Sequence, residues 1–306
     1  MRMLFALLSA LLILFDMPDK NGIETKSGPE QEQIPLFTFG VIADVQYCDC
    51  EPAGTRYYRS SLSKLREAVN TFVTDSVEFV VDLGDLIDRN FVSYKPVINI
   101  LDSSGLKIWH TTGNHDYSVD QRYKKRIPQL SKNREGYFSF ITKKIRFIAL
   151  NGNDISTYSA LKKKEAEEAR QLIKKVQAEG ESNGMDWNGG LGEKQMVWFK
   201  SQLDEAKTKG EKVIILCHFP VWPENQHNLL NYREVLNILE KYNNILAWFS
   251  GHNHSGNYGN FNLIHFVTFK GMVETETNSS YAEVEIYKNK IWIKGSGREK
   301  SQILAL

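Results

Sequence analysis

The chain has 306 residues with 38 basic and 37 acidic side chains, so its formal net charge is only +1. Charges of both signs are interspersed, and no basic stripe of the kind typical of nucleic-acid-binding proteins is present, so we expect no nucleic-acid partner. The apolar content is ordinary for a globular protein and allows a sizeable core. A small phosphorylated substrate stays compatible with this composition, because a local cluster of cations does not show in the net charge.

Three cysteines, Cys48, Cys50 and Cys217, are too few for a disulfide framework, and none belongs to a Cys-x-x-Cys pair. We therefore expect neither a disulfide framework nor a zinc knuckle. Cys217 follows an apolar run and is interpreted as a small core residue, not as a nucleophile.

Residues 1–20 resemble a targeting segment: Arg2 precedes an apolar stretch over 4–15, and polar residues follow. The stretch is shorter than the ~20 residues that span a membrane, and no small-x-small cleavage site follows it. Two interpretations stay open. The protein is exported or tethered, with its N-terminus in contact with a membrane, or it is cytoplasmic and starts at Met17.

Residues 21–33 are polar, contain glycine and proline, and are interpreted as a linker, which leaves residues 34–306 as one predicted domain. Short apolar runs in that domain fit buried strands, and they occupy residues 37–43, 79–83, 106–109, 145–150, 213–217 and 245–249. Between the first two, apolar residues from Leu62 to Val73 share one helical face. This alternation predicts a mainly parallel sheet of the α/β class.

The later part of the domain changes character. Residues 160–179 favour a highly charged helix with a solvated face, to which we assign no function. From Leu263 onward, alternating strands appear, and 281–287 and 290–295 are predicted to form an antiparallel hairpin.

Five polar clusters directly follow apolar runs. They are Asp44-Val45-Gln46, Gly84-Asp85, Gly113-Asn114-His115-Asp116, His218 and Gly251-His252-Asn253-His254. The carboxyl ends of parallel strands form the ligand crevice of such sheets, so we expect these clusters to converge. Together they offer enough oxygen and nitrogen ligands for two divalent cations.

Spacing supports this use, because Asp44 and Gln46, like His252 and His254, are two residues apart and can face one ion. A glycine before Asp85, Asn114 and His252 lets the backbone turn sharply. Each piece alone is weak, since an aspartate after a strand is often a helix cap. The histidines outside the clusters are interpreted as ordinary core or surface residues, and they are His110, His227 and His265.

The motifs Asp44-x-Gln46, GDLID, GNHD, His-Phe-Pro and GHNH resemble those of the calcineurin-like metallophosphoesterases. That superfamily usually has histidine where this chain has Gln46. The glutamine, together with the stretches at 56–59, 188–190, 231–233 and 271–275, is similar to the manganese-dependent ADP-ribose/CDP-alcohol diphosphatases. The resemblance runs from about Phe37 to Arg298, and the chain departs from it at Asn151, where relatives often have aspartate.

The resemblance implies two facing mixed β-sheets flanked by helices, an α/β/β/α sandwich. It implies that one divalent metal is held by Asp44, Gln46, Asp85 and His254, and the other by Asp85, Asn114, His218 and His252. Asp85 would bridge the two ions, and His115 would stabilise or protonate the departing oxygen.

Two cations would lower the pKa of a shared water and supply metal-bound hydroxide for direct attack on phosphorus. The amide oxygen of Gln46 is a harder ligand than imidazole, which favours Mn²⁺, with Mg²⁺, Fe and Zn²⁺ as alternatives.

Substrate contacts are expected around this centre. Arg56 and Tyr58 would begin the next helix and touch a second phosphate or a base; the alternative is an ordinary helix start. His227 would reach the nucleoside end, and Trp187 and Asn188 would line the crevice mouth; the alternative for residues 188–190 is a tight loop and helix N-cap. Tyr232 is a further candidate substrate contact.

The leading hypothesis is a monomeric hydrolase that splits the diphosphate bond of small nucleoside diphosphate derivatives such as ADP-ribose and CDP-choline. The alternatives are a phosphomonoesterase or phosphodiesterase with the same metals, and a scaffold that has lost catalysis. The scaffold is disfavoured because every expected ligand position is filled.

Overall fold

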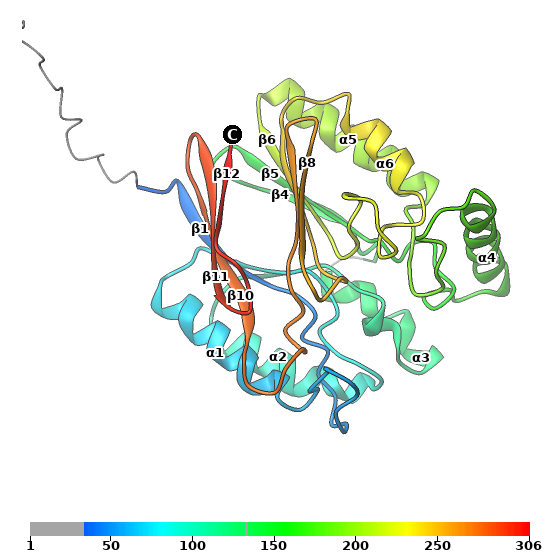
Figure 1. The fold of residues 1–306 in the computed structure, drawn as a ribbon, viewed down its shortest axis with the longest axis horizontal. Coiled ribbons are helices and arrows are strands. Elements are labelled where there is room, and N and C mark those ends of the chain that lie inside the picture. Colours follow the sequence, from blue (N-terminus) through cyan, green and yellow to red (C-terminus); the bar gives the residue numbers. More distant parts are fainter. Residues whose placement is uncertain (1–33, 132–133) are drawn as a thin grey trace, which may run out of the picture. The chain divides into compact units, whose positions relative to one another are not determined.

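Two mixed β-sheets of six strands each face each other in the described part of the chain (Figure 1). A computed structural model describes residues 34–131 and 134–306. The predicted targeting segment 1–20 and linker 21–33 lie outside the described residues. Residues 34–306 form one compact unit.

The first sheet has a parallel centre and an antiparallel flank. In spatial order its strands are β12 (Gln302–Ala305), β11 (Lys290–Gly297), β10 (Ser280–Ile286), β1 (Phe37–Ile42), β2 (Val80–Asp82) and β3 (Ile108–His110). Strands β1, β2 and β3 run parallel, and β10 pairs antiparallel with both β1 and β11. The predicted hairpin over 281–295 is confirmed as β10 and β11.

The second sheet is built in the same manner. Its spatial order is β4 (Phe138–Thr142), β5 (Ile145–Leu150), β6 (Lys212–Cys217), β7 (Ile245–Ser250), β9 (Ile264–Thr268) and β8 (Asn257–Phe261). The four inner strands β5, β6, β7 and β9 run parallel, and the edge strands β4 and β8 pair antiparallel with their neighbours.

Helices cover the outer face of each sheet. Against the first sheet lie α1 (Ser61–Thr74) and α2 (Tyr94–Ser103), whose Leu65 and Val97 share an apolar cluster with Ile42. Against the second lie α5 (Glu193–Lys209) and α6 (Tyr232–Leu239), packed through Phe199 and Val235. The four-layer sandwich implied by the family resemblance is therefore confirmed. The alternation of strands and helices in the sequence had predicted a mainly parallel sheet, whereas both sheets are mixed.

Aromatic side chains fill the space between the sheets. The Phe39 ring lies 5.1 Å from that of Phe79 and 5.4 Å from that of Phe147, centroid to centroid. Such pairs contribute about 0.5–1.5 kcal/mol each beyond the burial of their area. This layer fixes the two sheets against each other and hence the relative positions of the loops that follow their strands.

The remaining elements lie at the periphery. The charged helix is confirmed as α4 (Lys163–Ala178), whose i,i+4 ion pairs face solvent; α3 (Gln121–Lys124) is a single turn, and three short 3₁₀ segments span Phe91–Ser93, His115–Tyr117 and Ile127–Ser131. The predicted burial of Cys217 is confirmed. Within the described ranges, no helix combines the length and apolarity needed to cross a membrane.

Candidate metal centre

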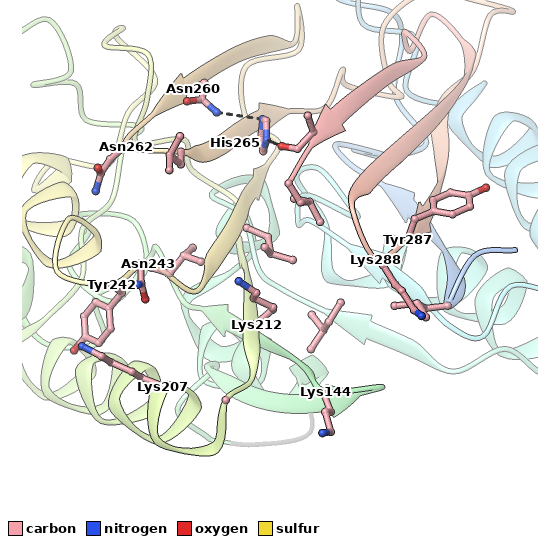
Figure 2. A pocket seen from close by; sticks show the side chains of 18 of the residues that line it. Lys144, Lys207, Lys212, Tyr242, Asn243, Asn260, Asn262, His265, Tyr287 and Lys288 are labelled. Carbon is pink, nitrogen blue, oxygen red and sulfur yellow. Dashed lines mark hydrogen bonds between the residues drawn. The ribbon is translucent and has the colours of Figure 1, made fainter. Parts of the chain in front are cut away.

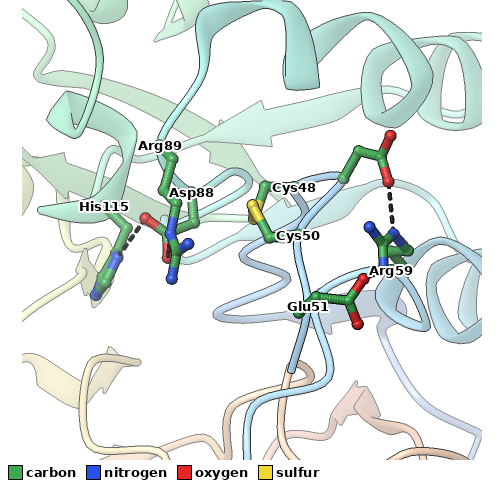
Figure 3. The surroundings of a disulfide bond; sticks show 8 residues. Cys48, Cys50, Glu51, Arg59, Asp88, Arg89 and His115 are labelled. Carbon is green, nitrogen blue, oxygen red and sulfur yellow. Dashed lines mark hydrogen bonds and ion pairs between the residues drawn. A yellow bond between two sulfur atoms is a disulfide. The ribbon is translucent and has the colours of Figure 1, made fainter. Parts of the chain in front are cut away.

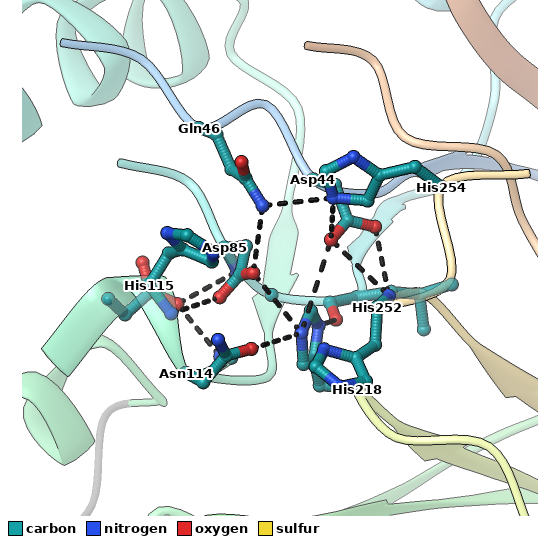
Figure 4. A network of polar contacts seen from close by, with 12 residues as sticks. Asp44, Gln46, Asp85, Asn114, His115, His218, His252 and His254 are labelled. Carbon is teal, nitrogen blue, oxygen red and sulfur yellow. Dashed lines mark hydrogen bonds and ion pairs between the residues drawn. The ribbon is translucent and has the colours of Figure 1, made fainter. Parts of the chain in front are cut away.

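The five polar clusters meet at one edge of the sandwich (Figure 4). Asp44 and Asp85 follow β1 and β2 of the first sheet, while His218 and His252 follow β6 and β7 of the second. Because all four strands end toward the same edge, residues more than 200 positions apart in sequence come into contact, as Asp44 and His252 do. The predicted convergence at the carboxyl ends of the strands is what the structure shows.

The backbone is strained at the four positions nearest the centre. Asp44, Gln46, Asp85 and His252 have φ values of 52°, 44°, 61° and 68°. Non-glycine residues adopt this left-handed region rarely, and such strain concentrates at functional sites. Backbone hydrogen bonds from Asp44 N to Gly84 O (3.0 Å) and from Gln46 N to Asp85 O (2.7 Å) hold the two loops in this conformation.

Glycine is required where these loops approach one another. A Cβ atom on Gly113 would lie 2.1 Å from Oδ1 of Asp85, and one on Gly251 would lie 2.6 Å from Oδ2 of Asp44. No side chain fits at such distances. The glycines that precede Asn114 and His252 therefore allow a close approach of backbone to carboxylate.

One group of donors surrounds Asp85. The Nε2 atom of His218 lies 3.3 Å from Asp85 Oδ2 and 3.2 Å from Asn114 Oδ1. Ligand atoms of Asp85, His218 and His252 all lie within 4.8 Å of one another, and all three residues are buried.

A second group surrounds Asp44. Its Oδ1 lies 3.3 Å from Nε2 of His254, which is 3.0 Å from the amide nitrogen of Gln46. The same amide nitrogen donates to Asp85 Oδ2 at 3.1 Å, so Asp85 lies between the two groups.

The chemistry of these donors fits cations. His218 Nδ1 lies 2.8 Å from the carbonyl oxygen of Leu83 and donates to it, so Nε2 carries the lone pair in the neutral ring. That lone pair faces the oxygens of Asp85 and Asn114, which are acceptors too. Such an arrangement repels unless a proton or a cation lies between the atoms. The buried Oε1 of Gln46 also has no hydrogen-bond partner within the described residues.

The pKa values of two histidines also indicate that the site favours positive charge. Burial alone would lower the pKa of His218, but Asp85, Asp44 and the carbonyl oxygen of Leu83 together outweigh burial and raise that pKa to about 9. Burial would also lower the pKa of His254, but Asp44 and Glu274 together outweigh it and raise that pKa to about 9. The site therefore draws positive charge, and a divalent cation would take the place of these protons, because metal ligands must be deprotonated.

Outer carboxylates orient the imidazoles. Oε1 of Glu274 lies 2.7 Å from Nδ1 of His254, which leaves Nε2 free to face Asp44. Asp116 accepts hydrogen bonds from the backbone nitrogens of Asp85, Leu86 and Gly113, and so ties two ligand loops together.

His115 stands apart from the donor groups. Its Nδ1 lies 3.1 Å from Oδ1 of Asp88, and its Nε2 lies 3.4 Å from Nη1 of Arg56. Its backbone nitrogen donates to Asp85 Oδ1 at 2.7 Å. His115 thus lies between Asp88 and Arg56 in the wall of the cavity described next.

A cavity of about 360 Å³ opens over the centre. It is lined by Gln46, Arg56, Asp85, Asn114, His115, Trp187, His227, His252 and His254. The structure thus brings Arg56 and His227 to the site, along with Trp187. Asn188 is completely buried behind the cavity, with its Oδ1 2.9 Å from His252 Nε2. It positions that imidazole and does not face the cavity.

Two predicted substrate contacts lie elsewhere. Tyr58 is buried with Cys48 and Val273, and Tyr232 donates from its hydroxyl to Glu181 beneath α4. The helix expected to start at Arg56 begins at Ser61, because Arg56 pairs its backbone with Ala53 and Glu274 in short β-bridges. Tyr58 lies in the turn that leads into α1 and not on a helix face, and its side chain is buried.

The cysteines also depart from expectation. Cys48 and Cys50 form a disulfide, with their Cα atoms 5.2 Å apart (Figure 3). The loop between β1 and Arg56 turns so tightly that residues two positions apart direct their sulfurs together. Arg59 closes the same loop through ion pairs with Asp49 and Glu51.

Comparisons with known proteins agree with this geometry. The family described as calcineurin-like phosphoesterase matches residues 37–256. This chain belongs to the calcineurin-like phosphoesterase family. The predicted superfamily and the predicted class of phosphoester hydrolase are therefore confirmed.

Individual relatives are similar along most of their length. A protein of Arabidopsis thaliana, named manganese-dependent ADP-ribose/CDP-alcohol diphosphatase, is 31% identical over 87% of this chain and 96% of its own. A human protein of the same name is 29% identical over 94% of this chain and 97% of its own. The crystal structure of a dimetal phosphatase from Danio rerio superposes with a TM-score of 0.80 at 26% identity, covering 89% and 99% of the two chains.

Proposed function

We propose that this chain is a Mn²⁺-dependent hydrolase that splits the diphosphate bond of nucleoside diphosphate derivatives, such as ADP-ribose and CDP-alcohols. The names of its relatives supply the substrate class and the metal. The observation that carries the proposal is that the donor groups open into a cavity shared with a cation, Arg56, and an aromatic ring, Trp187.

We assign the ligands as the donor geometry groups them. One ion would be held by Asp44, Gln46, Asp85 and His254, and the other by Asp85, Asn114, His218 and His252. When bound, two such ions activate water and offset the charge on phosphoryl oxygens. A set with four oxygen-bearing side chains suits a hard ion such as Mn²⁺.

The other residues would bind the substrate and move one proton. Water gives up one proton to the solvent as its oxygen forms a bond to one phosphorus, and the bond from that phosphorus to the bridging oxygen breaks. The bridging oxygen leaves on the second phosphate, and His115 Nε2 would hold the proton that it takes. Arg56, which lies beside His115, would bind that second phosphate through its guanidinium.

The nucleoside would lie at the opposite side of the cavity. His227 lies next to His252, with ring centroids 5.4 Å apart, and Trp187 is 40% exposed at the mouth. An exposed tryptophan beside a phosphate site offers a face on which a base can stack.

Metal reconstitution tests the proposal. The full-length protein, stripped of metal, would be assayed with Mn²⁺, Mg²⁺ or Zn²⁺ on ADP-ribose, CDP-choline, p-nitrophenyl phosphate and a cyclic nucleotide. We expect Mn²⁺-dependent release of AMP and CMP. Turnover of p-nitrophenyl phosphate or the cyclic nucleotide alone would retain the metal centre and refute the diphosphatase assignment.

A substitution at the mouth separates substrate choice from chemistry. Trp187→Ala should raise KM for ADP-ribose about 10-fold, since stacking on one base contributes about 1–3 kcal/mol. Turnover of p-nitrophenyl phosphate, which has no base, serves as the internal control and should not change. An equal effect on both substrates would contradict a base-stacking role.

We also propose that the protein acts as a monomer, because every proposed ligand and substrate contact comes from one chain. Sedimentation at assay concentration tests this, and a dimer that is active only when associated would refute it.

A further inference from the structure

A cavity of about 840 Å³ lies at the edge of the sandwich opposite the metal centre. Figure 2 shows side chains that line it. Its walls include Ile145, Lys212 and Ile245, the first residues of β5, β6 and β7, whereas the metal centre follows the last residues of these strands. The floor is apolar and includes Leu36 and Leu246. Nothing in the proposed reaction uses this cavity.

Lysines surround the opening. Six of them line it: Lys143, Lys144, Lys207, Lys212, Lys241 and Lys288. All six are exposed, and in the described part of the chain none has a carboxylate within ion-pair distance. The lining contains one acidic side chain, Glu240. Apolar lining residues beneath ammonium groups that have no carboxylate partner complement an anionic amphiphile.

Two of the tight turns at this edge have a backbone conformation that their side chains do not favour. The β4–β5 turn consists of Lys143 and Lys144, with φ of 46° and 63°, and the β8–β9 turn consists of Asn262 and Leu263, with φ of 51° and 63°. Two-residue hairpin turns of this kind favour glycine at the second position. The chain instead places there a lysine and a leucine, and Leu263 is 87% exposed.

Strain without packing indicates that these side chains serve a contact outside the fold. Leu263 is exposed and contributes little to the core, and Lys144 forms no ion pair with any described residue, so neither conformation is stabilised by such a contact within the domain. Two further exposed apolar side chains lie near this edge. Ile34 precedes the start of β1, and Leu306 follows the end of β12.

We propose that this edge, defined as the six lysines together with Leu263, docks onto an anionic membrane surface. The ammonium groups bind lipid phosphates and carboxylates, and Leu263 enters the apolar interface. The metal centre, at the opposite edge, then faces the water.

The sequence upstream of the described residues supports this partner. Residues 4–15 are apolar, and the chain enters the domain at Ile34, two residues before Leu36 in the cavity wall. Stable membrane attachment takes two signals, such as one apolar segment and one basic patch. The apolar segment is the first signal, and the lysine edge provides the second. The chain enters the domain at this same edge.

Vesicle binding by the full-length protein tests the proposal. The readout is the ratio of two affinities, measured for phosphatidylcholine vesicles with and without phosphatidylserine. Residues 4–15 are expected to bind both kinds of vesicle equally, so their contribution cancels in this ratio. Each lysine near an anionic surface contributes about fivefold. Lys144→Gln/Lys212→Gln/Lys288→Gln should therefore lower this ratio about 100-fold, and raised salt should lower it for the native protein.

A matched control removes the same charge from another face. Lys163→Gln/Lys174→Gln/Lys200→Gln neutralises three exposed lysines on α4 and α5, away from the cavity, and should leave the ratio near the native value. Turnover of a soluble substrate should be unchanged in both triple variants. An equal drop in the two variants would overturn a site-specific role.

Leu263→Gly separates docking from folding. Glycine suits a positive φ, so the fold should be at least as stable, while affinity for phosphatidylserine vesicles should fall about 10-fold because the apolar contact is lost. Unchanged affinity in this variant and in the cavity triple variant would refute the proposal. So would a concentration-dependent dimer that Leu263→Gly abolishes, because a second copy would then be the occupant.

Discussion

Residues with a strained, positive φ lie at both edges of the sandwich, but their side chains are buried at one edge and exposed at the other. At the carboxyl edge, residues with positive φ, such as Asp44 and His252, are buried, and their side chains converge on one another. At the opposite edge, residues with equally positive φ, such as Lys144 and Leu263, project outward. Strain that is fixed by surrounding hydrogen bonds can hold a reactive geometry, whereas strain in an exposed turn can only present a side chain to something outside.

Electrostatics separates the edges as well. Buried acceptors at the carboxyl edge draw positive charge. Against the effect of burial, Asp85, Asp44 and the carbonyl oxygen of Leu83 together raise the pKa of His218 to about 9. The lysine edge carries exposed positive charge, and in the described part of the chain its six lysines have no carboxylate within ion-pair distance. The first edge thus requires cations, and the second requires anions.

The largest effect expected from this comparison is at Asp85. Asp85→Ala should lower kcat at least about 1,000-fold, because a residue between both donor groups is lost along with several kcal/mol of charge stabilisation. Mn²⁺ binding should fail in the same variant. Lys212→Gln, at the other edge, is the control and should keep native kcat. Retention of two tightly bound ions by Asp85→Ala would contradict the bridging assignment.

His115 should affect chemistry without affecting metal. His115→Asn should lower kcat about 100-fold, the usual loss for a general acid, because the departing oxygen no longer receives its proton. Mn²⁺ affinity measured by calorimetry should stay native, since His115 lies outside the donor groups. Loss of metal binding in this variant would make His115 a ligand and not an acid.

Glu274 should act through His254. Glu274→Gln removes the carboxylate that lies 2.7 Å from Nδ1 of His254, and should weaken Mn²⁺ binding about 10–100-fold. A positioning role predicts that saturating Mn²⁺ restores most of kcat. If kcat stays low at saturation, Glu274 takes part in the chemistry itself.

The smallest effect is expected at the lysine edge. Leu263→Gly should raise the free energy of unfolding by about 0.5–1 kcal/mol, because the strain of a leucine at positive φ exceeds the entropy that glycine loses. Urea unfolding measures this, with kcat as the control for an intact carboxyl edge. Destabilisation would show that Leu263 packs on the domain after all.

The sequence was most informative where apolar runs ended abruptly. Six predicted strands were confirmed because their buried β-branched runs leave little alternative, and the polar clusters after them converge because parallel strands end together. The edge strands β4, β8 and β12 were missed, since half of each faces solvent and their patterns are mixed.

Partners of the site residues were harder to predict than the ligands. Glu274 lies 20 residues from His254 in sequence, and only tertiary packing brings its carboxylate to the ring. Asn188 was expected to bind substrate, and the structure places it against His252. A motif shows which residue types are present, whereas the direction of a side chain depends on neighbours that are remote in sequence.

Binding of Mn²⁺ to the metal-stripped protein, measured by calorimetry, tests the central claim most directly. The donor geometry predicts two ions per chain, with protons released as they bind, because His218 and His254 must give up the protons that their raised pKa values retain. Binding of a single ion, or of two ions without proton release, would contradict a two-cation centre built from these residues.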